Sequence, residues 1–123
     1  MEKVSVATVE HYSWGKGCDG WHLVRQPSLA VISERMPART SEVLHLHFHA
    51  CQFFYVTSGT AVIEVEGTAV TLMAGEGLEI PPGTPHQTAN PGPGDLTFLL
   101  ISQPHHHGDR EVLVARPAPG TSV

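Results

Sequence analysis

Hydrophobic and polar residues alternate along most of this chain, in short segments that end at glycine, proline or asparagine. Residues 60–66 show the alternation clearly. Ala61, Ile63 and Val65 fall on one side of an extended chain, and Glu64 falls on the other. Successive side chains of a strand point to opposite faces of its sheet. We therefore predict a half-buried strand here, which leads into a tight hairpin at the next glycine.

Further segments rich in β-branched and aromatic residues are also predicted to be strands. The complete set covers residues 29–35, 43–49, 52–57, 60–66, 69–73, 78–80, 97–102 and 111–115. Turn signals separate them, for example Pro81-Pro82-Gly83. No stretch offers an amphipathic helix of three turns. Many short strands at regular spacing predict an all-β sandwich or barrel.

The segment Phe53-Phe54-Tyr55-Val56 departs from the simple alternation because it is apolar on both faces. Such a strand is expected to lie between the interior of a barrel and a second packed layer or subunit. A homodimer that uses this face is the oligomer we expect.

Length, charge and cysteine content exclude several classes of protein. The 123 residues are of the size of one domain with a single core. The net charge of −5 and the seven scattered Lys and Arg residues argue against nucleic acid as a partner. No apolar run reaches the ~20 residues that span a membrane, and the N-terminus does not resemble a signal peptide, so we expect a cytoplasmic protein. Two cysteines without a Cys-x-x-Cys pair indicate neither a zinc ribbon nor a disulfide framework.

The candidate chemistry lies in the run His45-Leu46-His47-Phe48-His49, where every second residue is a histidine. On a strand these imidazoles point to the same face. His86 follows a bend rich in proline and glycine that can turn its side chain back toward a neighbouring strand. Imidazole suits zinc, copper, iron and nickel, so the pattern favours a metal site over histidines that only form hydrogen bonds.

Two further groups of histidines have other interpretations. His49 falls on the same strand face as His45 and His47. It is a candidate for reaching the metal or, preferably, for lining the pocket as a group beside the ligands or as an acid or base. The run from His105 to His107 is interpreted as a solvated loop, with adventitious metal binding as the alternative.

Residues 39–90 carry two motifs through which the chain resembles the cupins. The second motif is met at every fixed position and at the family spacing. The first is met at three positions, with a glutamine where the family has glutamate and an arginine where it has the leading glycine. The matching residues are Gly75, Pro81, Gly83, His86 and Asn90 for the second motif, and His45, His47 and Gly59, with Gln52 and Arg39 as the exceptions, for the first.

This resemblance implies a double-stranded β-helix, or jelly-roll, barrel formed by a single cupin domain over residues 1–123, with segments 1–28 and 103–123 flanking the motifs. It also implies a divalent metal ion held by His45, His47, His86 and the residue at the acidic position, here Gln52. The amide oxygen of Gln52 can coordinate weakly, or Gln52 can hydrogen-bond a metal-bound water and leave three imidazoles with open positions. Iron, nickel, manganese, cobalt and zinc all remain candidates, because the same imidazoles accept each of them.

Three classes of function are compatible with such a site. The first is a metal-dependent enzyme such as a dioxygenase that acts on a small organic molecule, since three-histidine iron sites occur among cupin dioxygenases. The second is a metal-assisted isomerase, decarboxylase or lyase. The third is a non-catalytic sensor or module that binds a small ligand. Because cupin barrels carry unrelated chemistries, the fold does not choose among them.

Residues other than the fixed positions of the motifs give weaker signals. Glu42, Glu79 and Tyr55 are interpreted as surface or packing residues. The segment from Trp14 to His22 concentrates aromatic and turn residues before the barrel. It is expected to cover the mouth of the barrel or to contact a partner subunit, with a packing role favoured over contact with a substrate.

Overall fold

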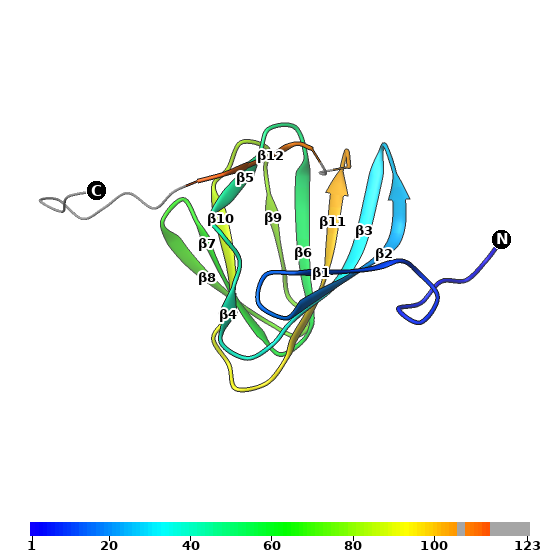
Figure 1. Ribbon diagram of the computed structural model, residues 1–123. Coiled ribbons are helices and arrows are strands. Elements are labelled where there is room, and N and C mark those ends of the chain that lie inside the picture. Colours follow the sequence, from blue (N-terminus) through cyan, green and yellow to red (C-terminus); the bar gives the residue numbers. More distant parts are fainter. Residues whose placement is uncertain (106–107, 114–123) are drawn as a thin grey trace, which may run out of the picture.

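The structure, a computed structural model, describes residues 1–105 and 108–113 and contains strands but no helix in that part of the chain (Figure 1). The strands form two antiparallel sheets that face each other, which confirms the predicted all-β jelly-roll fold. No helix in the described ranges has the length and apolar character needed to cross a membrane.

The first sheet has six strands in the order β1-β2-β3-β11-β6-β9, and the second follows the order β12-β5-β10-β7-β8, with β4 paired to β10. The strands of the first sheet are β1 (His11–Trp14), β2 (Cys18–Gln26), β3 (Leu29–Met36), β11 (Leu96–Gln103), β6 (Cys51–Ser58) and β9 (Gly77–Ile80). Those of the second are β12 (Arg110–Val112), β5 (His45–His47), β10 (His86–Asn90), β7 (Thr60–Val65), β8 (Thr68–Met73) and β4 (Thr40–Ser41).

Three predicted segments differ from the structure. The strand predicted over residues 43–49 is only three residues long in β5, because the chain bends after His47. The segment from Trp14 to His22, interpreted as a turn-rich cover, contributes to the β1–β2 hairpin, which extends the first sheet beside β3. The predicted strand at 111–115 begins at Arg110 in β12, and its last two residues lie outside the described residues.

The core fills the space between the sheets with inward-facing side chains. Ala61 and Ile63 are buried as the alternation predicts. Phe54 and Phe98 come from neighbouring strands and lie with ring centroids 5.7 Å apart. The remaining core side chains are mainly aliphatic, and burying them supplies the main driving force for folding.

The outer face of β6 is apolar, as its sequence predicts. Phe53 is 40% exposed, and its ring stacks on that of Tyr55 at a centroid distance of 6.4 Å. Phe54 and Val56 point inward and are buried. The homodimer expected at this face stays a prediction.

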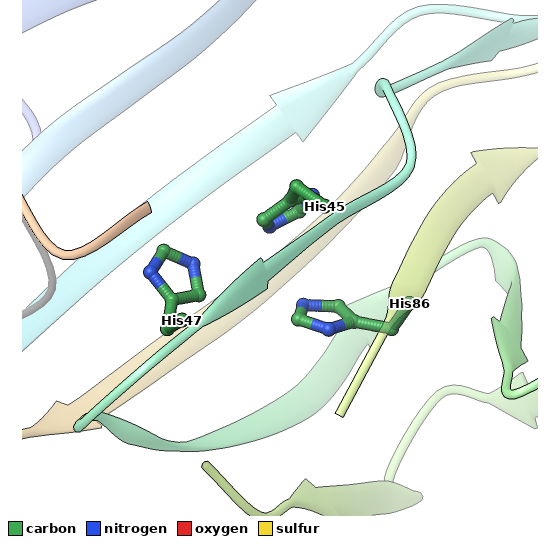
Figure 2. A group of neighbouring side chains, drawn as sticks. All are labelled: His45, His47 and His86. Carbon is green, nitrogen blue, oxygen red and sulfur yellow. The ribbon is translucent and has the colours of Figure 1, made fainter. Parts of the chain in front are cut away.

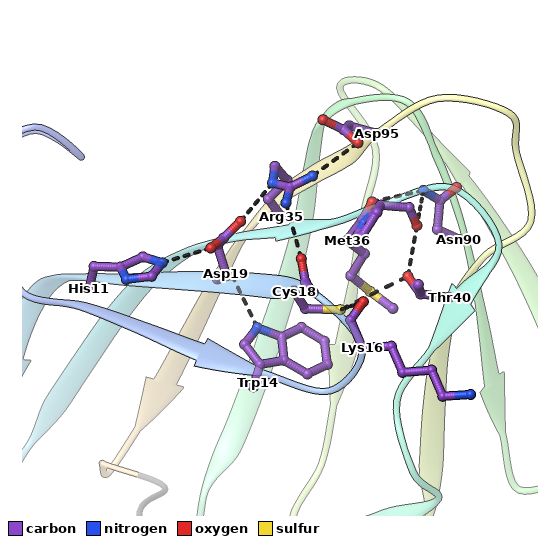
Figure 3. Close-up of polar contacts among 12 residues, drawn as sticks. His11, Trp14, Lys16, Cys18, Asp19, Arg35, Met36, Thr40, Asn90 and Asp95 are labelled. Carbon is purple, nitrogen blue, oxygen red and sulfur yellow. Dashed lines mark hydrogen bonds and ion pairs between the residues drawn. The ribbon is translucent and has the colours of Figure 1, made fainter.

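Asn90, the last residue of the second motif, holds a loop together at one end of the barrel (Figure 3). Its side-chain Nδ2 group donates to the carbonyl oxygens of Met36 at 2.9 Å, Pro37 at 3.1 Å and Gly94 at 2.8 Å. In the loop after Met36, Arg39 adopts a φ of 57°, a left-handed conformation that favours glycine. This left-handed conformation explains why the first motif has a glycine at this position. In this chain an arginine adopts the same conformation.

The β1–β2 hairpin is tied to the rest of the first sheet by ion pairs (Figure 3). Asp19 accepts a hydrogen bond from Arg35 Nε at 2.7 Å and contacts His11 Nε2 at 2.7 Å. Arg35 also contacts Asp95 at 3.1 Å. This network fixes the position of the hairpin, whose residues Tyr12 and Trp14 line the cavity described below.

Candidate metal centre

Three imidazoles predicted from the sequence come together on the inner face of the second sheet (Figure 2). His45 and His47 lie on β5, and His86, at the start of β10, pairs directly with His45. Because paired residues of neighbouring strands point to the same face, the pairing turns all three rings inward. The ring centroids are 4.4 Å apart for His45 and His86, and one nitrogen of each residue lies within 4.8 Å of the others.

Hydrogen bonds to the backbone orient two of these rings. The Nδ1 atoms of His45 and His86 lie 2.9 Å from the carbonyl oxygens of Val43 and Thr84. Since a carbonyl oxygen only accepts, each Nδ1 carries the proton and each Nε2 keeps a lone pair. His86 Nε2 is buried and has no hydrogen-bond partner among the described residues. A hydrogen bond from one ring nitrogen to a backbone carbonyl oxygen fixes the ring so that the other nitrogen can coordinate a metal.

The environment also keeps these imidazoles neutral. Burial lowers the pKa of His45 to about 3 and lowers the pKa of His86 as well, because a charged ring is poorly solvated inside the protein. Neutral imidazole is the form that binds a metal. The cluster has the geometry, the burial and the lone pairs that a divalent ion needs.

Gln52 lies on β6 and lines the same cavity as His45 and His47. Only 2% of Gln52 is exposed. Its Nε2 group donates to Ser102 Oγ at 3.1 Å, and its Oε1 atom is buried without a hydrogen-bond partner among the described residues. An unsatisfied buried amide oxygen costs free energy. A metal ion or a metal-bound water would satisfy it, so the structure is compatible with both roles expected for Gln52.

His49 does not join the cluster, and the prediction that it lines the site is wrong. The strand ends at His47, and the chain bends, so the alternation that would turn His49 inward is interrupted. The His49 side chain is exposed. Of the later histidine run, His106 and His107 lie outside the described residues.

A cavity of about 220 Å³ opens beside the imidazoles. Its lining also includes acidic and aromatic residues that the sequence analysis did not assign to the site. Tyr12 from β1 donates a hydrogen bond through its hydroxyl to Glu34 Oε1 on β3 at 2.9 Å. The lining residues are Tyr12, Trp14, Glu34, Glu42, His45, His47, Gln52, Phe54, Leu100, Gly108 and Arg110.

Glu34 and Glu42 place two carboxyl groups in this cavity. Burial raises the pKa of Glu34 to about 7, and the Tyr12 hydrogen bond and the charge of Arg110 limit the rise. Burial raises the pKa of Glu42 to about 8, and the nearby Glu34 carboxyl adds to the effect. Both carboxyl groups are therefore harder to ionise than ordinary glutamates. The interpretation of Glu42 as a surface or packing residue is wrong, because it lines the cavity, 3.7 Å from His45 Nδ1.

One of these residues carried a signal in the sequence. In β3, Ala30, Ile32 and Met36 are fully buried, and Glu34 occupies the inward position between them. A single acidic residue on the apolar side of an alternating strand indicates a polar site in the interior. Trp14 belongs to the segment expected to cover the mouth of the barrel, and it lines the cavity. Tyr12 gave no comparable signal, since the β1–β2 hairpin was not predicted.

Comparison with known proteins agrees with this fold. The Cupin domain family matches residues 32–102, more than half of the chain. The chain therefore belongs to the cupin family. An uncharacterized protein of Methanocaldococcus jannaschii is 29% identical over 79 residues, which is 63% of this chain and 63% of that protein. The chain thus matches less than two thirds of the length of this curated relative.

Solved structures share the fold at low sequence identity. An RmlC-like cupin from Shewanella frigidimarina superposes with a TM-score of 0.78 at 19% identity, over 88% of this chain and 95% of that one. A variant of Streptomyces PAC13 with uridine superposes with a TM-score of 0.77 at 20% identity, over 93% and 92% of the two chains. PAC13 is described as a nucleoside dehydratase. At these identities the likeness shows the fold alone.

Proposed function

We propose that this protein is a metal-dependent enzyme that transfers protons on a small organic molecule, as an isomerase, decarboxylase or lyase does. One observation carries the proposal. Two members of the three-imidazole cluster, His45 and His47, line the same small cavity as the hydrogen-bonded pair Tyr12 and Glu34. Metal ligands and a group able to hold a proton thus face the same space.

His45, His47 and His86 would hold the ion, with Gln52 as a fourth ligand or as the partner of a bound water. A divalent ion in this place supplies Lewis-acid chemistry, which polarises a substrate oxygen. The chain's own residues handle the proton. Tyr12 holds Glu34 by its Oε1 atom, and Glu34 Oε2 accepts no hydrogen bond from the described residues. Glu34 would therefore take or give a substrate proton at Oε2.

A dioxygenase is the second candidate, and the nature of the ligands favours it. Among the described residues the cluster contains three histidines and no carboxylate, and three-histidine iron sites occur among cupin dioxygenases. Both candidates require the metal, but only the dioxygenase requires oxygen. The third candidate function is a non-catalytic binding module, which is expected to show no turnover and to consume no oxygen.

Turnover experiments with the metal-loaded protein, without a histidine tag, separate these readings. The protein is incubated in D2O with glycerate, gluconate and pyruvate, with and without oxygen, and compared with His45→Ala/His47→Ala protein. Proton-transfer chemistry predicts deuterium at carbon by mass spectrometry, independent of oxygen and absent from the variant. Oxygen consumption in an electrode would favour the dioxygenase. Stoichiometric metal without turnover on these compounds or with oxygen would favour the binding module.

The position of Gln52 can be tested by adding a charge. Gln52→Glu is expected to tighten binding of a divalent ion about tenfold or more, because a carboxylate attracts the ion and an amide is neutral. Competition with a chromogenic chelator measures the affinity. Gln26→Glu, which adds the same charge at the exposed end of β2, should leave the affinity unchanged. Equal affinities for Gln52→Glu and wild-type protein would place Gln52 away from the ion.

A further inference from the structure

The cavity beside the imidazoles has two chemically different ends. Glu34, only 7% exposed, forms a buried acidic end with Glu42 and the hydroxyl of Tyr12. Arg110 also lines the cavity but is exposed to solvent. A ligand that fills this space therefore meets hydrogen-bonding carboxyl groups inside and a guanidinium toward the solvent.

The fold fixes the place of Arg110. On β12 it pairs with His47 of β5, so its side chain leaves the sheet on the inner face that carries the imidazoles. The preceding residue, Asp109, anchors the strand. Its carboxylate accepts hydrogen bonds from the backbone N–H groups of Phe48 at 3.1 Å, His49 at 2.9 Å and Ala50 at 2.8 Å. The strand pairing with His47 and the hydrogen bonds of Asp109 thus hold the backbone of Arg110 beside the cavity.

Within the described part of the chain, Arg110 has no acidic partner of its own. None of the ion pairs between described residues includes it. Its charge still acts on Glu34 and on His45 across the cavity. A guanidinium binds a carboxylate through two parallel hydrogen bonds, so an unpaired arginine on a cavity wall is suited to an anionic ligand.

The volume of the cavity and its aromatic lining residues restrict the class of ligand. The volume of about 220 Å³ is below the ~300–1,000 Å³ of sites for drug-sized molecules, which indicates a small ligand. Trp14 and Phe54 offer aromatic surface to a carbon skeleton. Trp14 is held in place because its Nε1 group donates to the carbonyl oxygen of Asp19 at 3.0 Å.

The balance of charge favours an anion. A divalent ion contributes two positive charges and Arg110 contributes one, against at most two negative charges from Glu34 and Glu42. The loaded cavity is therefore net positive, which opposes an amine and attracts a carboxylate. The buried carboxyl groups remain as hydrogen-bond partners for hydroxyl groups.

We propose that the cavity binds a small hydroxylated carboxylic acid of the sugar-acid kind. The ligand carboxylate contacts Arg110, and its hydroxyl groups hydrogen-bond to Glu34, Glu42 and Tyr12. This inference rests on the proposed function, since it takes the same cavity to hold a metal ion.

Calorimetric titration of zinc-loaded protein tests the ligand class with three kinds of compound. The hydroxy acids are glycerate, gluconate and glucuronate. The matched polyols are glycerol, sorbitol and glucose, and the matched acids without hydroxyl groups are propionate and hexanoate. At least one hydroxy acid should bind more than tenfold tighter than its matched polyol and its matched simple acid.

Two variants assign the two ends of the ligand. Arg110→Gln should weaken binding of the hydroxy acid about 10- to 100-fold, as expected for a lost charge-assisted hydrogen bond, and remove its preference over the polyol. Glu34→Gln keeps an oxygen that can accept from Tyr12 and should instead reduce the preference over the simple acid. Arg25→Gln, the same change in an exposed residue paired with Glu10, should bind like the wild type.

Metal content, measured on every sample by elemental analysis, separates this inference from the proposed function. Full metal content with no preference for hydroxy acids would overturn the ligand class and leave the metal site standing. A preference that survives Arg110→Gln would overturn the assignment of that residue. Wild-type protein that takes up no zinc would instead contradict the proposed function.

Discussion

His86→Ala protein is expected to contain only trace metal while wild-type protein prepared in the same way contains close to one ion per chain. The substitution removes one of three imidazoles whose ring nitrogens converge within 4.8 Å. The two remaining histidines occupy fewer coordination positions of the metal ion and therefore bind it far less tightly. Elemental analysis of tag-free protein measures the difference directly.

The same variant should remain folded. His86 is 1% exposed, and its Nε2 atom has no hydrogen-bond partner among the described residues. Removing the ring therefore costs the hydrogen bond from Nδ1 to the Thr84 carbonyl oxygen, worth about 1 kcal/mol. The strand pairing of β10 uses the backbone, which alanine retains. Far-UV circular dichroism should match that of the wild type. A variant that is unfolded, or that keeps full metal content, would contradict the role given to His86.

His49→Ala is the matched control for this experiment. It removes an imidazole from the same histidine run, but from an exposed bend outside the cluster. Its metal content should equal that of the wild type. Loss of metal in His49→Ala would mean that the bend after His47 brings His49 to the ion.

The contrast between His47 and His49 shows which part of the site could be predicted from the sequence. Alternation predicts the direction of side chains only as far as the strand extends. The local sequence contains no signal that β5 ends at His47. The end is imposed by a partner distant in the chain, since Asp109 binds the backbone N–H groups of the following bend. His86 was predictable because a motif fixed its spacing from the proline and glycine of the preceding turn.

The acidic end of the cavity was harder to predict, for a reason of topology. Tyr12 reaches Glu34 because the β1–β2 hairpin is added to the edge of the first sheet, beside β3. Gly20 permits this approach: a Cβ atom there would lie 2.2 Å from the Tyr12 ring. Propensity and periodicity describe each strand separately, whereas a site built from several strands depends on which of them become neighbours.

Phe98→Ala is expected to lower the free energy of unfolding by about 3–5 kcal/mol, the usual cost of truncating a buried phenylalanine. Phe98 is 2% exposed in β11, the strand between β3 and β6, and its ring lies against that of Phe54. Urea unfolding of metal-free protein, followed by circular dichroism, gives the value.

Thr97→Ala provides the control on the same strand. Thr97 points away from the core, and its Oγ1 atom lies 2.9 Å from Thr57 Oγ1 at the exposed surface, so its loss should cost no more than about 1 kcal/mol. Equal decreases in the free energy of unfolding for the two variants would show that β11 does not carry the core.

A large decrease for Phe98→Ala in protein without metal, together with a folded His86→Ala variant, would show that apolar packing maintains the barrel independently of the ion. A barrel stabilised in that way can keep polar, unsatisfied groups such as Gln52 Oε1 and His86 Nε2 in its interior, ready to bind an ion.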